Sequence, residues 1–249
     1  MSVLNTISRE KSKAIACTIL GDAGVGKSTF AATFPKPLFI RAEDGLASID
    51  VDALPLLTKV DDLWEQLKAL INEQHNYKTI IIDSVTKLES MFIDYVLAND
   101  PKMPKSINTA MGGYGAGMMS VSAMHNRVRK AAQLLLNKGI NVVFIAHADT
   151  VTIEMPDSDP YMRYDLRLGK KSVSYYTDDV DLVGFIKLEA FVKNEDGKKS
   201  KAFSDGTRLL TTYATAANVS KNRFGIKEDL ILVEGVNPLV DFIKFLGDK

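Results

Sequence analysis

One stretch near the start of the chain, GDAGVGKST at residues 21–29, constrains the fold more than any other. It fits the pattern G-x-x-x-x-G-K-[ST], which Gly21, Gly26, Lys27 and Ser28 fill. The apolar run AIACTIL precedes it and FAATFPK follows, so the stretch lies where a strand would pass into a helix. This context predicts a phosphate-binding loop in an α/β fold whose sheet is mostly parallel and flanked by helices.

The residue types in this loop suit a polyphosphate such as that of ATP. Glycine lets the backbone adopt positive φ and approach a ligand closely, so that successive N–H groups can surround an anion. We expect Lys27 to reach the β- and γ-phosphates, Ser28 to ligate Mg²⁺ through its hydroxyl, and Thr29 to lie against the α-phosphate. The alternative is a glycine-rich turn that only caps a helix. The expected nucleotide-binding residues are Gly21, Asp22, Ala23, Gly24, Val25, Gly26, Lys27, Ser28 and Thr29.

Length and composition set limits on the class of protein. The 249 residues and the lack of a linker predict a single domain, residues 1–249, in which residues 1–13 form a short N-terminal arm. The formal net charge is zero, so any nucleic-acid binding would require a local basic patch. No apolar run approaches the ~18 residues of a membrane span. The single cysteine, Cys17, fits a reducing compartment, and we expect a cytoplasmic protein.

The remaining pattern alternates strands and helices. Apolar runs predict strands at 37–44, 78–85 and 141–149, and helical spacing predicts helices at 61–74, 86–97 and 118–139. Residues 100–116 and 150–168 are rich in proline, glycine or polar residues and are expected to be mobile loops. A β-rich end with an N-E-D-G turn at 194–197 predicts antiparallel strands along one edge of the sheet.

Three positions at strand ends carry side chains suited to phosphate chemistry. Asp83 ends the run TIIID, where ligands bind in open α/β sheets, and would hold Mg²⁺; it could otherwise cap the next helix. Either Glu43 or Asp44 could activate water, or both could belong to a solvated turn. His147 ends NVVFIAH at the same edge and could sense the γ-phosphate. The other histidines, His75 and His125, are expected at the surface.

The order of these motifs resembles the ATPase core of RecA-type recombinases over most of residues 14–190. The segments that carry the resemblance are GDAGVGKST, FIRAED, TIIIDSV, GMMSVSAMHNRVRK, VVFIAH and KKSVSYY. The resemblance implies ATP hydrolysis with Mg²⁺. It also implies that Glu43 is the water-activating base, that Asp83 is the metal-holding acid, and that His147 is a sensor where the family often has glutamine.

The same resemblance maps the two DNA-binding loops of that family onto residues 100–116 and 150–168. These segments interleave cations and aromatic rings, a mixture that suits single-stranded DNA because cations pair with phosphates and rings stack on bases. A mobile loop of mixed charge would have a similar composition. The candidate DNA-binding residues are Lys102, Lys105, Tyr114, Tyr161, Arg163, Tyr164 and Arg167.

The segment KNRFG at 221–225 resembles the K-x-R element of hexameric RecA-fold ATPases, which reaches into the active site of the neighbouring subunit. The resemblance assigns this role to Lys221 and Arg223, and it implies a homo-oligomer with ATP at subunit interfaces. A cationic finger of this kind stabilises transition-state charge. The alternative is a pair of surface cations.

Within this class, the compact chain resembles phage nucleotide-binding proteins of the RecA-like branch linked to Sak-type single-strand annealing. The resemblance implies an ATPase, encoded by a phage or prophage, that binds single-stranded DNA and promotes annealing or homologous recombination. A single-strand DNA-binding protein would be a possible partner. Two alternatives stay open: a helicase-type DNA motor, and an ATP-gated oligomeric interaction module that does not bind DNA.

Overall fold

The structure is a computed structural model and describes residue 7 together with residues 13–193, 201–204 and 206–247. Most of the expected N-terminal arm and the whole N-E-D-G turn at 194–197 therefore lie outside the described residues. The other expected elements fall within them.

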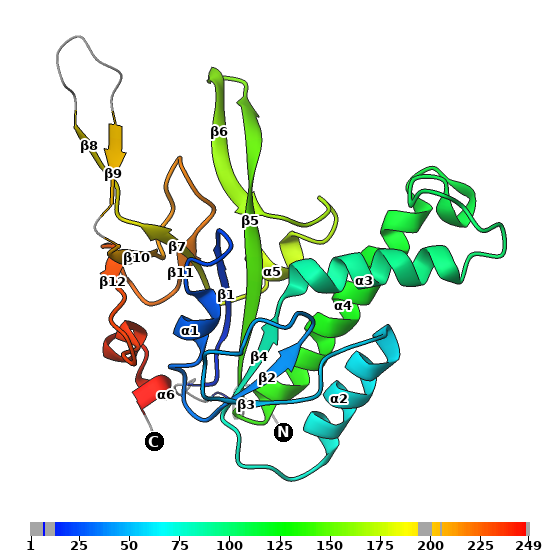
Figure 1. Cartoon of the computed structure of the whole chain (residues 1–249), viewed down its shortest axis with the longest axis horizontal. Coiled ribbons are helices and arrows are strands. Elements are labelled where there is room, and N and C mark those ends of the chain that lie inside the picture. The colour runs from blue at the N-terminus through cyan, green and yellow to red at the C-terminus, as the bar shows by residue number, and fades with distance from the viewer. Residues whose placement is uncertain (1–6, 8–12, 194–200, 205, 248–249) are drawn as a thin grey trace.

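A sheet forms the centre of the molecule (Figure 1). Six strands run parallel in the order β3-β2-β4-β5-β1-β7, and antiparallel β10 and β12 extend the β7 edge. This arrangement confirms the predicted fold class. The sheet strands are β1 (Ala16–Gly21), β2 (Pro37–Arg41), β3 (Asp52–Ala53), β4 (Thr79–Asp83), β5 (Asn141–Met155), β6 (Ser158–Leu166), β7 (Leu182–Leu188), β10 (Arg208–Thr211), β11 (Lys221–Asn222) and β12 (Leu230–Ile231). A separate hairpin pairs β8 (Phe191–Lys193) with β9 (Lys201–Phe203).

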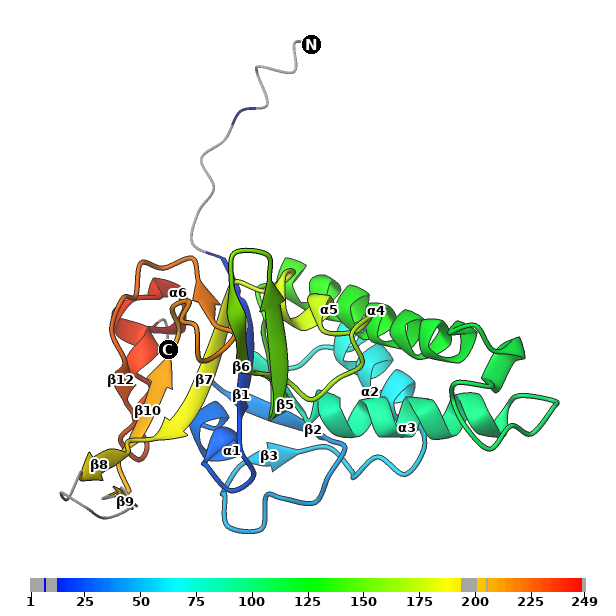
Figure 2. The ribbon, with the colours of Figure 1, turned by 90° about the horizontal axis from the view of Figure 1, so that it is seen from above.

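Helices cover both faces of the sheet, as Figure 2 shows. Alternate strand residues point to opposite faces, so Ile80 and Ile82 pack among α2, α3 and α4 while Ile81 packs with α1 and the C-terminal helices. The described part of the chain contains no helix with the length and apolarity to cross a membrane. The helices are α1 (Lys27–Ala31), α2 (Val60–Asn72), α3 (Val85–Ala98), α4 (Ala116–Asn137), α5 (Ser174–Thr177) and α6 (Lys244–Gly247), with 3₁₀ turns η2 (Ala110–Gly112) and η3 (Pro238–Asp241).

The prediction of a loop at 150–168 is wrong, because β5 and β6 form a long antiparallel hairpin there. Val151 lies opposite Arg163 and Thr152 opposite Met162, and the register shifts between Ile153 and Met155, close to the turn. The hairpin extends beyond the main sheet (Figure 1), and residues 149–157 and 159–164 of its outer part are exposed or half-buried. Residues 150–153 are all β-branched, and Tyr161 and Tyr164 are aromatic, which are residue types that favour extended backbone.

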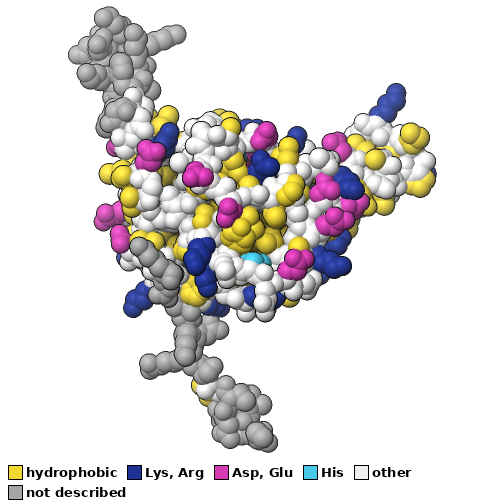
Figure 3. Space-filling view, turned by 60° about the horizontal axis from the view of Figure 1, so that its bottom comes forward, with side chains coloured by type: hydrophobic (Ala, Val, Ile, Leu, Met, Phe, Trp, Pro, Cys, Tyr) yellow, Lys and Arg dark blue, Asp and Glu magenta, His cyan; other side chains and the backbone are white. Residues whose placement is uncertain are grey.

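The segment expected as the other loop, residues 100–116, is largely irregular, and its mobility stays a prediction. Residues 99–115 connect α3 to α4 and contain only the short turn η2. We call this segment, with the helix ends that carry it, the arm; it projects to one side of the molecule in Figure 1. Met103, Met111 and Tyr114 have positive φ and exposed side chains. Figure 3 shows hydrophobic side chains gathered at the end of the arm.

The expectation that His125 lies at the surface is wrong, because its side chain is fully buried. It belongs to the apolar stripe of α4 that includes Val121 and Val128, and this spacing was the signal for burial. Its Nδ1 lies 2.7 Å from the hydroxyl of Tyr176, and its ring packs edge-on against Phe92. Burial lowers the pKa of His125 to about 3.

This lowered pKa predicts a loss of stability in mild acid. Below pH ~6.5 the unfolded chain binds a proton at His125 that the folded chain does not, so the stability present above that pH falls as the pH drops toward 3. The contribution of one histidine is at most about 1.4 kcal/mol per pH unit. We expect the free energy of unfolding, measured with urea, to fall more steeply between pH 7 and 5 in the wild type than in His125→Gln. If it falls equally steeply in both proteins, His125 is not buried in its neutral form.

Candidate active site

The predicted phosphate-binding, metal-holding and water-activating residues meet at the edge of the sheet where β1, β2 and β4 end and β5 continues into its hairpin with β6. The strand register sets Gly21 beside His147 and Asp83 beside Ile145, and the chain reaches Glu43 just beyond the end of β2. A cavity of about 320 Å³ opens there. The side chains that line it include Lys27, Ser28, Thr29, Glu43, Asp83 and His147.

Two glycines at the ends of the loop between β1 and α1 are required by its geometry. A Cβ atom on Gly21 would lie 2.6 Å from the carbonyl oxygen of Ile186 on neighbouring β7, so no larger residue fits there. Gly26 precedes α1 with φ +97°, a conformation that residues with a side chain rarely adopt. The loop is therefore held close to the sheet and turns sharply into the helix.

Lys27 is the first residue of α1, and its buried side chain turns back into this loop. Its ammonium donates hydrogen bonds to the carbonyl oxygens of Gly21 at 3.0 Å and Asp22 at 2.8 Å. Burial lowers the pKa of Lys27, while the negative charges of Asp83 and Glu43 oppose that change. Neutral carbonyls are weaker partners for an ammonium than phosphate oxygens. The arrangement therefore fits a phosphate group that replaces these carbonyls as the partner of Lys27.

Ser28 and Asp83 form the second contact in the cavity. The Ser28 hydroxyl donates to Oδ2 of Asp83 at 2.6 Å, and burial raises the pKa of Asp83. Hydroxyl and carboxylate oxygens are ligands that Mg²⁺ accepts, and this ion keeps several waters or phosphate oxygens as well. Among the described residues, no three His, Cys, Asp or Glu side chains gather as a metal site. The pair fits a metal ion that a bound polyphosphate would help to hold.

Glu43 and His147 form a hydrogen-bonded pair across the cavity. Nε2 of His147 lies 3.2 Å from Oε1 of Glu43. This bond is the largest cause that lowers the pKa of Glu43, to about 2, and Ser84 also donates to the carboxylate. Both side chains of the pair are partly exposed, so water can reach them. Asp44 instead pairs with Arg41 at 3.5 Å and is mostly exposed, so of the two acids only Glu43 contacts His147.

Sequence reasoning missed three contributors to this site. The Thr86 hydroxyl bonds to the backbone amide of His147 at 3.0 Å, and Ser84 follows Asp83 directly. Arg208, on β10, lies against Gly26: a Cβ atom there would be 3.3 Å from its Nε. No local pattern points to Arg208, because β10 is far from the loop in sequence and reaches it only through the pairing of β10 with β7.

Lys221 and Arg223 do not join this cavity in the same chain. β11 pairs with the first residues of β7, so it lies toward the opposite end of that strand from the phosphate loop. Lys221 donates to the carbonyl oxygen of Asp178 at 2.7 Å, and Arg223 pairs with Asp181 at 2.8 Å. Their reach into a neighbouring subunit stays a prediction.

The candidate DNA-binding residues fall into two separate groups. Lys102, Lys105 and Tyr114 are exposed on the arm. Those of the hairpin are engaged within the chain: Arg163 pairs with Asp165 at 2.9 Å, the Tyr164 ring stacks on Phe185, and the Tyr161 hydroxyl contacts the sulfur of Met155.

Arg167 is placed at the base of the hairpin and not at its tip. Its amide donates to the carbonyl oxygen of His147 at 2.9 Å, and its guanidinium donates to that of Ala148 at 3.0 Å. It lies near enough to Lys27 for its charge to contribute to the lowered pKa of that ammonium. This residue therefore belongs to the surroundings of the phosphate loop, and DNA contact by it stays a prediction.

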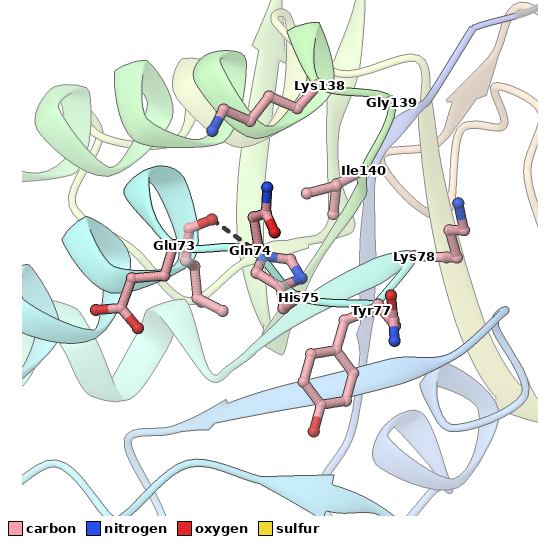
Figure 4. A pocket seen from close by; sticks show the side chains of 10 residues that line it. Glu73, Gln74, His75, Tyr77, Lys78, Lys138, Gly139 and Ile140 are labelled. Carbon is pink, nitrogen blue, oxygen red and sulfur yellow. Dashed lines mark hydrogen bonds between the residues drawn. The ribbon is translucent and has the colours of Figure 1, made fainter.

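A larger cavity, of about 560 Å³, lies at the opposite ends of the strands, where β4 and β5 begin (Figure 4). His75 bonds through Nε2 to the carbonyl oxygen of Leu70 at 3.0 Å, and Lys138 donates to that of Ile71. Both carbonyls are in the last turn of α2, where they lack partners within the helix. These two side chains therefore complete the end of a helix, and the cavity is distant from Asp83 and His147.

Comparisons with known proteins identify a family and a structural neighbour of this chain. The KaiC-like protein PH0186 from the hyperthermophilic archaeon Pyrococcus horikoshii OT3 is similar in structure, with a TM-score of 0.42 and 12% identity over 89% of this chain and 90% of that one. No curated protein matches the sequence. The model of the AAA domain family matches residues 13–224, which include every residue of the cavity that contains Lys27, Glu43 and Asp83. The chain therefore belongs to the AAA domain family and is a P-loop NTPase.

Proposed function

We propose that the chain hydrolyses ATP with Mg²⁺ and that Glu43 activates the attacking water. The observation that supports this most strongly is the Glu43–His147 pair, which lies in the same cavity as Lys27 and the Ser28–Asp83 contact. Phosphate-binding, metal-binding and water-activating groups thus surround one space. A protein that binds ATP without hydrolysing it would not require the ionised carboxylate of Glu43 in this cavity.

Each residue has a distinct task in this proposal. Lys27 binds the β- and γ-phosphates, and Ser28 and Asp83 hold Mg²⁺, which neutralises charge that develops on the phosphates. Glu43 accepts a hydrogen bond from the attacking water and then its proton. With a pKa of about 2, the carboxylate is a weak proton acceptor while His147 donates to it. If Nε2 of His147 donates to the γ-phosphate instead, Glu43 loses that hydrogen bond. Its pKa then rises, and Glu43 becomes a stronger base than it is in the pair.

Replacing His147 with alanine tests this link through the pH dependence of turnover. The substitution removes the bond that favours the ionised form of Glu43, so the pKa of Glu43 should rise from about 2 toward its usual value near 4.3. We expect the acid limb of the kcat/KM profile to move to higher pH in His147→Ala. An acid limb at the same pH in both proteins would show that His147 does not set the pKa of Glu43. The matched control is His75→Ala, which removes a histidine at the opposite edge of the sheet.

We further propose that single-stranded DNA binds at the arm and that turnover requires a homo-oligomer. The support is the resemblance to recombinases together with exposed Lys102, Lys105 and a Tyr114 side chain that is fully open to solvent. The narrower resemblance to phage single-strand annealing proteins, and a role in annealing, belong to this proposal as well.

A second candidate, an ATP-gated interaction module without DNA, is favoured by other features of the surface. The arm also exposes Met103 and Met111, and five acidic residues lie along the hairpin from 149 to 165. Figure 3 shows cationic and anionic side chains interspersed on the face that it displays. An apolar tip without a basic field suits a protein partner.

One experiment distinguishes the DNA-binding ATPase from the interaction module. ATP turnover with Mg²⁺ is measured at several protein concentrations, with and without unstructured single-stranded DNA. Stimulation that rises more than linearly with protein supports DNA binding and composite sites. Lys102→Ala/Lys105→Ala should weaken that stimulation and its salt dependence, whereas Lys130→Ala, an exposed cation on α4, should not. A rate of ATP turnover that is the same with and without DNA would favour the interaction module.

A further inference from the structure

A second cavity opens directly off the phosphate loop. It measures about 160 Å³ and shares Gly26 and Thr29 with the cavity that contains Lys27, Glu43 and Asp83. Thr29 is the loop residue expected beside the α-phosphate. The part of a nucleotide beyond its α-phosphate, which is the ribose and the base, would therefore pass from the first cavity into the second.

One wall of this second cavity is the side chain of Arg208. It lies over the outer side of the loop at Gly26, where a Cβ atom would approach its Nε to 3.3 Å and its Cζ to 3.5 Å. The guanidinium makes no hydrogen bond or ion pair within the part of the chain that the structure describes. A planar guanidinium that has no partner can stack on an aromatic ring.

The facing wall is the turn formed by residues 232–236. Its position is fixed to Arg208 through the backbone, because the amide of Leu232 donates to the Arg208 carbonyl oxygen at 2.9 Å. A hydrogen bond from the amide of Val236 to the carbonyl of Val233 closes the turn. Val233 and Val236 both line the cavity and are more than half exposed, although they are apolar. The cavity thus has a cationic side and an apolar side, which suits a flat heteroaromatic ring.

We propose that Arg208 and the turn 232–236 form the nucleobase subsite, in which the Arg208 guanidinium stacks on the base. The inference rests on the proposed function, because it requires a nucleotide with its phosphates on Lys27. Glu234 is the carboxylate of this wall and supplies an acceptor for an exocyclic amino group such as that of adenine. The subsite accounts for recognition of the base, which the phosphate loop alone does not provide.

The test compares ATP with inorganic tripolyphosphate, which has phosphates but no base, by titration calorimetry. Stacking of this kind is worth about 0.5–2 kcal/mol, so Arg208→Ala should weaken ATP binding by about 2- to 30-fold and leave tripolyphosphate binding unchanged. Arg208→Lys keeps the charge but loses the plane and should weaken ATP binding as well. Lys227→Ala, which removes an exposed cation away from the cavity, is the control and should change neither.

Other outcomes would overturn the subsite. Equal losses for both ligands would make Arg208 a phosphate ligand, and no loss for either would remove it from the site. A wild type that binds ATP no better than tripolyphosphate would have no base subsite, although the phosphate loop would stand. Failure of the proposed function looks different: a wild type that binds ATP but does not hydrolyse it would end the hydrolase assignment and leave the subsite in place.

Discussion

Replacing Lys27 with alanine should reduce ATP affinity by about 10²- to 10⁴-fold and abolish measurable turnover. The ammonium now donates to two carbonyl oxygens of its own loop, and phosphate oxygens would take their place. Each hydrogen bond between a cation and an anionic acceptor contributes about 1.5–3 kcal/mol, and the variant loses two. Titration of the purified variant with ATP and Mg²⁺ measures the loss.

The control for this variant is Lys87→Ala, which removes an exposed cation from α3 and should leave ATP binding unchanged. Because Lys27 is buried, thermal unfolding of Lys27→Ala must first show a folded protein. Lys27→Met fills the space of the aliphatic stem without the charge and should lose ATP binding to the same extent. Tight ATP binding by either folded variant would contradict the assignment of the phosphate loop.

The phosphate loop and the strand ends were predictable because they depend on local sequence. The glycine, lysine and serine pattern specifies a strand, a loop and a helix without reference to the rest of the chain. The rule that parallel strands end at one edge then places Asp83, Glu43 and His147 together. The spacing left Glu43 and Asp44 equivalent, and the structure separates them through the partner of each carboxylate, His147 and Arg41.

The features that sequence reasoning missed depend on contacts between distant segments. The sequence of the hairpin of β5 and β6 resembles that of a loop, because the outer parts of both strands face solvent and have no continuous apolar side. The apolar stripe of α4 indicated that His125 could be buried, but the hydroxyl that bonds to its buried ring nitrogen comes from Tyr176, fifty-one residues away. Arg208 reaches the phosphate loop through the order of strands in the sheet, which no local pattern specifies.

Replacing Glu43 with glutamine should lower kcat by about 10²- to 10⁴-fold and preserve ATP binding. Glutamine keeps the size of the side chain and can still bond to His147, but it cannot accept a proton from water. Loss of a negative charge near Lys27 and Asp83 also reduces repulsion of the phosphates, so affinity should stay the same or rise. Steady-state turnover and equilibrium titration together separate the two effects.

Asp44→Asn is the matched control, because Asp44 is the adjacent acid, also borders the cavity, and is 74% exposed in its pair with Arg41. Its kcat should stay near that of the wild type, since its carboxylate lacks the contact with His147 that holds Glu43 in place. If Asp44→Asn loses activity and Glu43→Gln does not, the base is misassigned although the fold and the phosphate loop are right. If both keep full activity, water is activated by another group, and the Glu43–His147 pair has a structural role only.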